Sequence, residues 1–188
     1  SDFTFIFVGN VDVEKMKPVI AEYLGALPAV NRKETFKDNK IEMRQGIYKN
    51  EFTKQQETPK ASVFAFYNGD CKYDLRNNLL LSMTSQILDL VYTEKVREDE
   101  GGTYGVYVGG TLQKYPKEKA ILQIIFDTAP EKKEKLMKII FGEIDNITKT
   151  GPSEANLNKV KEYMLKKHTE DLKENSYWLG SIDEYLYT

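Results

Sequence analysis

The chain has 188 residues, of which 40% are hydrophobic and 30% are charged, values that suit a globular domain with one large core. Its 27 lysines and arginines nearly balance 29 aspartates and glutamates, and no basic stripe stands out, which argues against nucleic-acid binding. No apolar run approaches the roughly 18 residues of a membrane-spanning helix, and no signal peptide is visible at the start.

Candidate metal ligands are scarce. Cys71 is the single cysteine, so neither an internal disulfide nor a multi-cysteine zinc site can form. His168 is the single histidine, whereas zinc sites usually need several ligands. We interpret Cys71 as a small residue at a turn and His168 as a structural residue near the apolar side of a helix. The chain by itself is expected to bind no metal or other cofactor and to be inactive in hydrolysis.

The first part of the chain predicts strands around one helix. Residues 3–8 are apolar on both alternating faces, which is typical of a buried strand covered above and below. Asp12 is a plausible N-cap, and helical spacing of apolar residues predicts a helix over residues 13–24. Residues 41–54 alternate weakly and predict one strand or a bent strand pair. Residues 61–67 predict a further strand.

A long helix and a hairpin follow. The helix is predicted from residue 73 to about residue 97, with one buried stripe formed by Leu80, Met83, Ile87 and Val91. After two glycines, alternating residues share one strand face, namely Tyr104, Val106, Val108, Gly110 and Leu112. Residues 120–126 are apolar on both faces and predict a central strand, antiparallel to the preceding one.

The last third predicts helices in series. One helix begins near Pro130, with an apolar stripe formed by Leu136, Ile140, Ile144 and Ile147. A second follows a cap at Ser153, and a third begins after residues 175–176. Helices segregated from a mainly antiparallel sheet indicate the α+β class. Because no linker rich in Gly, Ser or Pro divides the chain, we expect a single α+β domain over residues 1–188. The apolar last helix suggests a fragment of a longer multidomain protein, truncated within that helix.

Arg97 and Tyr104 are the candidate site residues. The arginine is expected in a last helical turn and the tyrosine at a strand start seven residues later, so one tight turn can bring both to a sheet edge. A guanidinium and a phenol can bind a carbonyl, a carboxylate or a developing oxyanion. The structural alternative is that Arg97 interacts with the last carbonyls of its helix and that Tyr104 packs on the sheet.

Two other patterns have structural explanations. The glycines between residues 101 and 110 lack the Gly-Lys-Ser/Thr ending of a phosphate loop and follow a helix instead of a strand. Tyr104, Tyr107 and Tyr115 could line a peptide-binding surface, although strand tyrosines are more often half-buried packing residues.

Several motifs in order resemble those of pitrilysin-type zinc peptidases, the family of insulin-degrading enzyme and the mitochondrial processing peptidase. The segment Phe5-Ile-Phe-Val-Gly-Asn-Val-Asp12, with Tyr23-Leu-Gly-Ala-Leu-Pro28, is similar to the family's opening strand and helix. The stretch from Tyr92 to Val108 resembles its Arg-Glu-x-x-Gly-x-x-Tyr-x-Val region. Asp127-Thr-Ala-Pro130 and Asn175-Ser-Tyr-Trp-Leu179 also fit, so that the match covers nearly the whole chain.

The resemblance implies a fold and a role. Similar α+β domains of such peptidases form two halves that close around a chamber, and the first half holds zinc on an inverted His-x-x-Glu-His motif. The last domain contributes an arginine and a tyrosine near the scissile carbonyl of the peptide, and Arg97 and Tyr104 match these positions. The expected partners are therefore the N-terminal zinc-binding half of the same protein and a peptide substrate. A periplasmic or secreted location is suggested by the resemblance alone.

The inverted zinc motif is absent from these 188 residues. Any zinc of the full-length protein would therefore be bound outside this chain. The first hypothesis is the substrate-clamping half of a zinc endopeptidase. A second is a non-catalytic scaffold or partner subunit of the same fold, and a third is an unrelated α+β ligand-binding domain.

Overall fold

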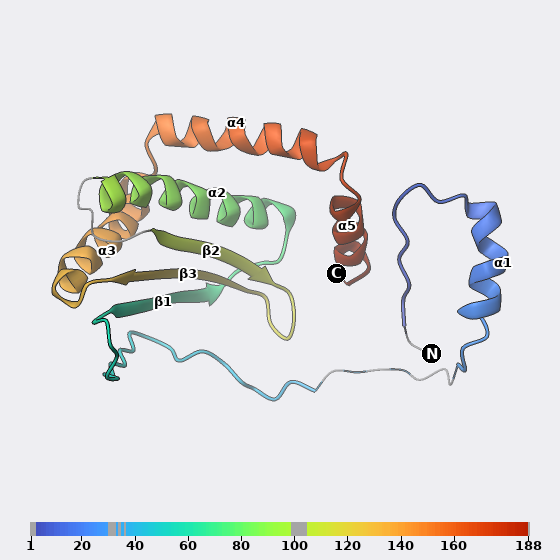
Figure 1. Ribbon diagram of the computed structural model, residues 1–188, viewed down its shortest axis with the longest axis horizontal. Coiled ribbons are helices and arrows are strands. Elements are labelled where there is room, and N and C mark those ends of the chain that lie inside the picture. The colour runs from blue at the N-terminus through green and yellow to red at the C-terminus, as the bar shows by residue number, and fades with distance from the viewer. Residues whose placement is uncertain (1–2, 30–32, 34, 36, 99–104, 188) are drawn as a thin grey trace. The chain divides into compact units, whose positions relative to one another are not determined.

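The computed structural model describes residues 3–29, 33, 35, 37–98 and 105–187, and it divides into two compact units (Figure 1). Unit 1 combines Ser1–Lys40 with Met164–Thr188, and unit 2 is Ile41–Tyr163. Unit 2 contains the sheet and every buried apolar residue of the described chain. The single domain expected over residues 1–188 stays a prediction, because compactness alone does not establish where a domain ends.

A three-stranded antiparallel sheet organises unit 2. Its strand order is β1 (Ala61–Asp70), β3 (Lys119–Thr128) and β2 (Val106–Gln113). The central position of β3 and the β2–β3 hairpin are both as predicted, and the α+β class is confirmed. Even-numbered residues of β3 face the core, where Ile124 and Phe126 are almost fully buried.

Helices cover that face of the sheet. In Figure 1, α2 (Leu75–Tyr92) lies along the strands, and its N-cap Asp74 accepts a hydrogen bond from the Asn77 amide at 2.8 Å. It continues into a π-helical turn, η1 (Thr93–Glu98), so that together they account for the predicted long helix. After the short 3₁₀ turn η2 (Pro130–Lys132), α3 (Lys133–Thr150) adds Leu136 and Ile140 to the same core.

The buried stripe predicted for α2 is wrong in part. Ile87 and Val91 are buried as expected, but Leu80 is exposed and Met83 is only half-buried. The helix is apolar over more than one face, so spacing alone did not decide which face meets the sheet. The residues that reach the main core cluster are Leu88, Tyr92 and Val96, whereas the stripe predicted for α3 is confirmed.

Tyr92 links α2 to α3 through a buried polar contact. Its side chain is buried among apolar neighbours, and its hydroxyl donates a hydrogen bond to the Ile140 carbonyl oxygen at 2.9 Å. Burial raises the pKa of this phenol well above its usual range. The ring therefore stays neutral and acts as a hydrogen-bond donor at every physiological pH.

A close approach between α2 and β2 requires glycine. A Cβ at Gly110 would lie 2.6 Å from the Leu81 Cγ and 2.7 Å from the Ser85 Oγ. Ser85 is itself buried and donates to the Leu81 carbonyl oxygen at 3.0 Å. Any larger residue at position 110 would force the helix away from the strand.

The helical C-terminal third follows the predicted boundaries. Gly151, with φ of 76°, ends α3, a conformation that favours glycine. Ser153 caps α4 (Glu154–Asp171) by accepting a hydrogen bond from the Asn156 amide at 3.2 Å. The last helix, α5 (Asn175–Tyr187), begins at the predicted break.

The strand expected over residues 3–8 is not formed. These residues are extended but belong to no strand, and none of them is buried. They precede α1 (Val13–Tyr23), whose N-cap Asp12 accepts a hydrogen bond from the Lys15 amide at 3.2 Å, as predicted. A strand needs a neighbour, and the described part of the chain pairs none with this segment.

The strands expected over residues 41–54 are also absent. This stretch is irregular and exposed along its whole length. Ion pairs tie it to the rest of unit 2, from Glu42 to Lys117 and Lys119 and from Glu51 to Lys133. Side-chain ion pairs of this kind can attach a segment without any backbone pairing. The weak alternation of apolar residues in this stretch did not specify a strand register.

We expect Tyr92→Phe to lower the free energy of unfolding by about 1 kcal/mol, because it removes one buried hydrogen bond while keeping the ring. Urea unfolding followed by circular dichroism measures the change. Tyr163→Phe is the matched control, since that ring is exposed on α4. Equal stability of the Tyr92 variant and the unsubstituted chain would contradict a stabilising role for the hydroxyl.

Candidate functional site

Two core residues flank residues 97–104, the candidate segment that contains Arg97 and Tyr104. Val96, in η1, is fully buried, and Val106, the first residue of β2, is almost fully buried in the same cluster. Arg97 directly follows the first of these residues, and Tyr104 precedes the second by two positions. Both candidate positions are therefore within two residues, in sequence, of a side chain buried in the core.

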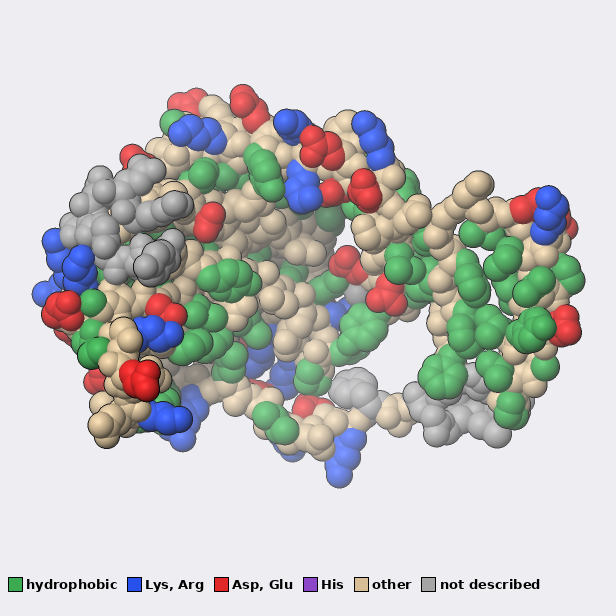
Figure 2. All heavy atoms as spheres, viewed as in Figure 1, with side chains coloured by type: hydrophobic (Ala, Val, Ile, Leu, Met, Phe, Trp, Pro, Cys, Tyr) green, Lys and Arg blue, Asp and Glu red, His purple; other side chains and the backbone are tan. Residues whose placement is uncertain are grey.

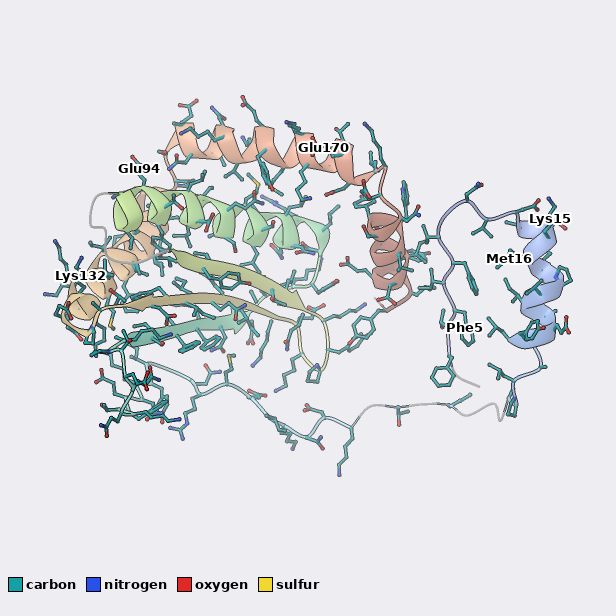
Figure 3. The ribbon with its side chains drawn as sticks, in the orientation of Figure 1. Phe5, Lys15, Met16, Glu94, Lys132 and Glu170 are labelled. Carbon is teal, nitrogen blue, oxygen red and sulfur yellow. The ribbon has the colours of Figure 1, made fainter. Side chains whose placement is uncertain are left out.

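The turn that carries Arg97 is held from a second side. Lys95 of η1 forms an ion pair with Glu143 of α3, and the Glu143 side chain is largely buried. Figure 3 labels Glu94 near the start of the same turn. π-Helical turns inside longer helices occur often at functional sites, because the wider turn changes the direction of its side chains. The backbone position of Arg97 is consistent with such a site.

The relative placement of the two candidates remains a prediction. The structure describes the backbone of Arg97 within η1, but its side chain and Tyr104 lie outside the described residues. The structure therefore brings the flanking residues Val96 and Val106 into one core and leaves untested the pairing of guanidinium and phenol.

The sheet face opposite α2 and α3 is open and aromatic. Phe64 of β1, Ile125 of β3 and Tyr107 of β2 lie in one row across the three strands. Phe66 and Gln123 continue the neighbouring row. Relative exposures are 62% for Phe64, 51% for Phe66 and 55% for Tyr107, so three large rings of unit 2 face solvent on one surface. We call the residues Phe64, Phe66, Tyr107, Gln123 and Ile125 the open-face patch.

Gly109 makes room for the ring of Tyr107. A Cβ at Gly109 would lie 2.5 Å from the Tyr107 Oη and 3.1 Å from the Gln123 Nε2. The tyrosine therefore lies along its own strand, over the glycine, and its hydroxyl accepts a hydrogen bond from Gln123 at 3.4 Å. Successive glycines of β2 thus serve opposite faces, with Gly109 under Tyr107 and Gly110 under α2.

Charged groups lie at both ends of the open-face patch. Asp127, opposite Ser62 in the register, accepts hydrogen bonds from the Ser62 hydroxyl at 2.6 Å and from Lys60 at 3.0 Å. The hydrogen bond from Ser62 is the main cause that lowers the pKa of the Asp127 carboxyl below its usual range, and the bond from Lys60 adds to it. At the other end Lys119 is buried and lies 3.6 Å from the Glu42 carboxylate. Both ends are therefore occupied by paired charges.

Cys71 lies in unit 2 and His168 in unit 1. Cys71 follows β1 directly and is half-buried. His168 is exposed on α4, with its ring edge-on to Tyr177 at 5.7 Å. Trp178, the residue after Tyr177, donates a hydrogen bond from its indole N–H to the Leu172 carbonyl oxygen at 2.9 Å, across the turn between α4 and α5. Among the described residues no group of three or more His, Cys, Asp or Glu is placed to hold a metal ion.

Comparison with known proteins identifies the family. Residues 1–164 match the family described as the peptidase M16 inactive domain. The chain belongs to this family. The resemblance to pitrilysin-type zinc peptidases is thereby confirmed, and the chain is the inactive-domain type of a zinc metallopeptidase family.

Individual relatives agree with this assignment. A zinc protease PQQL-like protein of Arabidopsis thaliana is 23% identical over 195 residues, which cover 97% of this chain and 20% of that protein. The periplasmic protease PqqL from Escherichia coli has the same fold, with a TM-score of 0.75 and 19% identity over 95% of this chain and 20% of its own. A peptidase M16 inactive domain from Pseudomonas fluorescens has a TM-score of 0.55 and 25% identity, over 66% of this chain and 30% of its own. The chain thus spans about a fifth of the length of the first two relatives.

The open-face patch was missed at the sequence level, apart from Tyr107. The signal was present in residues 61–67, where small residues alternate with Phe64 and Phe66 so that both faces of the strand are apolar. A strand that is apolar on both faces but lies at the edge of a sheet with one helical layer leaves one set of side chains uncovered.

We expect Gly109→Ala and Gly110→Ala to differ in effect, although they are neighbours in one strand. Gly110→Ala should lower the free energy of unfolding by about 1–3 kcal/mol, since its Cβ meets the packed α2. Gly109→Ala should cost little stability but displace the Tyr107 ring, because its Cβ meets the free end of a flexible side chain. Urea unfolding and the NMR shifts of the Tyr107 ring measure the two effects. Equal loss of stability in both variants would show that the two faces do not differ in this way.

Proposed function

We propose that this chain is the substrate-clamping half, without zinc ligands of its own, of a zinc endopeptidase that cleaves peptides in an enclosed chamber. The observation that supports it most directly is the open-face patch. One of its exposed rings, Tyr107, lies on β2, the strand that follows residues 97–104 in sequence. The other two, Phe64 and Phe66, lie on β1 of the same sheet. A large uncovered apolar surface on a domain with a packed opposite face indicates a contact surface.

The chemistry assigned to Arg97 and Tyr104 is stabilisation of charge on the scissile carbonyl oxygen. A guanidinium and a phenol donate hydrogen bonds that strengthen as the oxygen becomes an oxyanion. Zinc bound by the N-terminal half would supply Lewis-acid polarisation and an activated water. The backbone fixed at Val96 and Val106 supports this role, because oxyanion donors act best when their positions are set before the reaction.

The open-face patch would hold the peptide on either side of the cleaved bond. Aromatic side chains provide large contact areas at a low cost in conformational entropy. The bond from Gln123 restrains the Tyr107 ring, so that less mobility is lost when a peptide binds. The substrate class supported by this surface is an extended peptide with apolar side chains.

The partner of this chain would be an N-terminal zinc-binding half of the same protein. The relatives are about five times longer than the region matched here, which supports additional polypeptide of that kind. The E. coli relative is described as periplasmic, and we propose the same compartment for this protein. Among the described helices none is both long and apolar enough to cross a membrane.

A non-catalytic scaffold of the same fold is the second candidate. The observation behind it is that the matching family is described as an inactive domain. The polypeptide preceding Ser1 separates the two functions. An intact His-x-x-Glu-His motif there supports the peptidase, and a degraded motif supports the scaffold.

In the full-length protein we expect Arg97→Ala and Tyr104→Phe to reduce kcat about a hundredfold or more, corresponding to about 3 kcal/mol, with little change in KM. Interactions made only in the transition state affect the rate and leave ground-state binding unchanged. Arg76→Ala is the matched control, since that arginine is exposed in the first turn of α2. Unchanged kcat in both site variants, at unchanged melting temperature, would leave these residues with helix-end and packing roles only.

The open-face patch should behave in the opposite way. We expect Phe64→Ser, Phe66→Ser and Tyr107→Ser each to raise KM for apolar peptides by about tenfold, with kcat nearly unchanged, because they remove binding common to ground and transition states. Leu75→Ser is the control, since that exposed leucine lies at the start of α2, which packs on the other face of the sheet. Wild-type KM in all three variants would exclude this face as a peptide surface.

A further inference from the structure

Unit 1 has no core of its own. None of its described residues is buried, whereas the buried apolar residues among those that the structure describes lie between Ile87 and Val160, in unit 2. Small folded units need a hydrophobic interior to offset the conformational entropy lost on folding. A unit formed by α1, α5, the end of α4 and an irregular segment, without one buried side chain among its described residues, is therefore incomplete.

Its apolar side chains are nevertheless abundant. Relative exposures are 76% for Phe3, 48% for Phe5 and 48% for Phe7, and the rings of Phe3 and Phe5 lie 6.4 Å apart. Figure 2 shows apolar side chains gathered on the surface of this unit. On α1 and α5 the large exposed apolar residues are Val13, Val19, Tyr23, Trp178, Leu179, Ile182, Tyr185, Leu186 and Tyr187. Surfaces of this kind mark a contact with other protein.

The segment over residues 3–8 has the pattern of a central strand. Ile6 and Val8 are half-buried, while Phe3, Phe5 and Phe7 on the alternate face are exposed. In Figure 3, Phe5 marks this segment and Met16 marks α1. A strand that is apolar on both faces requires neighbours along its backbone edges and a covering layer on each face. Within unit 1 the described residues provide helices but no second strand.

We infer that residues 3–8 are a strand of a second β-sheet, whose other strands are contributed by the polypeptide that precedes Ser1. Strands that follow one another in sequence are usually neighbours in a sheet, so the preceding polypeptide is the expected source. The relatives offer ample additional chain, since the matched region is about a fifth of their length. Unit 1 is then part of the domain before it, and unit 2 carries a separate core. This inference does not depend on zinc or on catalytic activity.

Amide hydrogen exchange in the full-length protein tests the strand directly. Residues 4–8 should exchange about a hundredfold or more slowly than the irregular residues 43–54 of the same molecule, because strand amides are protected by pairing. Equal exchange rates in the two segments would overturn the inference, since an unpaired segment has no such protection.

A photo-crosslink identifies the neighbour. Phe7 is replaced by p-benzoylphenylalanine in the full-length protein, and the cross-linked peptides are mapped by mass spectrometry after irradiation. The expected product joins residue 7 to a peptide that precedes Ser1. A link to β1 or β2, to polypeptide after Thr188, or to a second copy, seen as a covalent dimer, would each overturn the assignment.

A matched pair of variants tests the energetic side. Phe5→Asp should lower the melting temperature of the full-length protein, because it would place a charge on the covered face of the proposed sheet. Ile47→Asp introduces the same charge at an exposed residue of the irregular stretch and should leave the melting temperature unchanged. If Phe5→Asp prevents folding altogether, Phe5→Leu keeps the apolar character and should preserve both folding and amide protection. Equal melting temperatures for Phe5→Asp and Ile47→Asp would contradict burial of this face.

Discussion

The packing of α2, η1 and α3 on one face of a three-stranded sheet is the constraint on which unit 2 depends. Ile124 and Phe126 of the central strand lie in that interface, with Leu88 and Tyr92 from α2. Because β3 is paired on both edges and covered on one face, it fixes the register of β1 and β2. A displacement of α2 would therefore change the positions of both ends of the candidate segment at once.

One-sided covering also explains the chemistry available on the other face. The sheet alternates side chains between its two surfaces, so every residue that fills the core places a neighbour on the open side. Phe64, Phe66 and Tyr107 are those neighbours, and paired charges border them at both ends. Two adjacent glycines allow close contacts on both faces of β2, because α2 packs against Gly110 on one face and the Tyr107 ring lies over Gly109 on the other.

The two units differ in how their apolar residues are used. Unit 2 buries a core of large side chains, whereas none of the described residues of unit 1 is buried. The family match extends across both units, from residue 1 to residue 164. A family region can therefore contain the end of one packed body and the beginning of another, since sequence matching follows the chain and packing does not.

Local periodicity and capping residues by themselves determined the helix limits, the β2–β3 hairpin, the central position of β3 and the α+β class. Asp12, Asp74 and Ser153 accept the first-turn amide bonds as N-caps do, and α3 buries its predicted stripe. Only the tertiary structure decided which face of α2 is buried and that the aromatic face of the sheet stays open. It also left residues 3–8 without a neighbouring strand. The physical reason is that an apolar pattern determines that a surface is to be buried, while the partner that buries it is set by contacts between distant parts of the polypeptide.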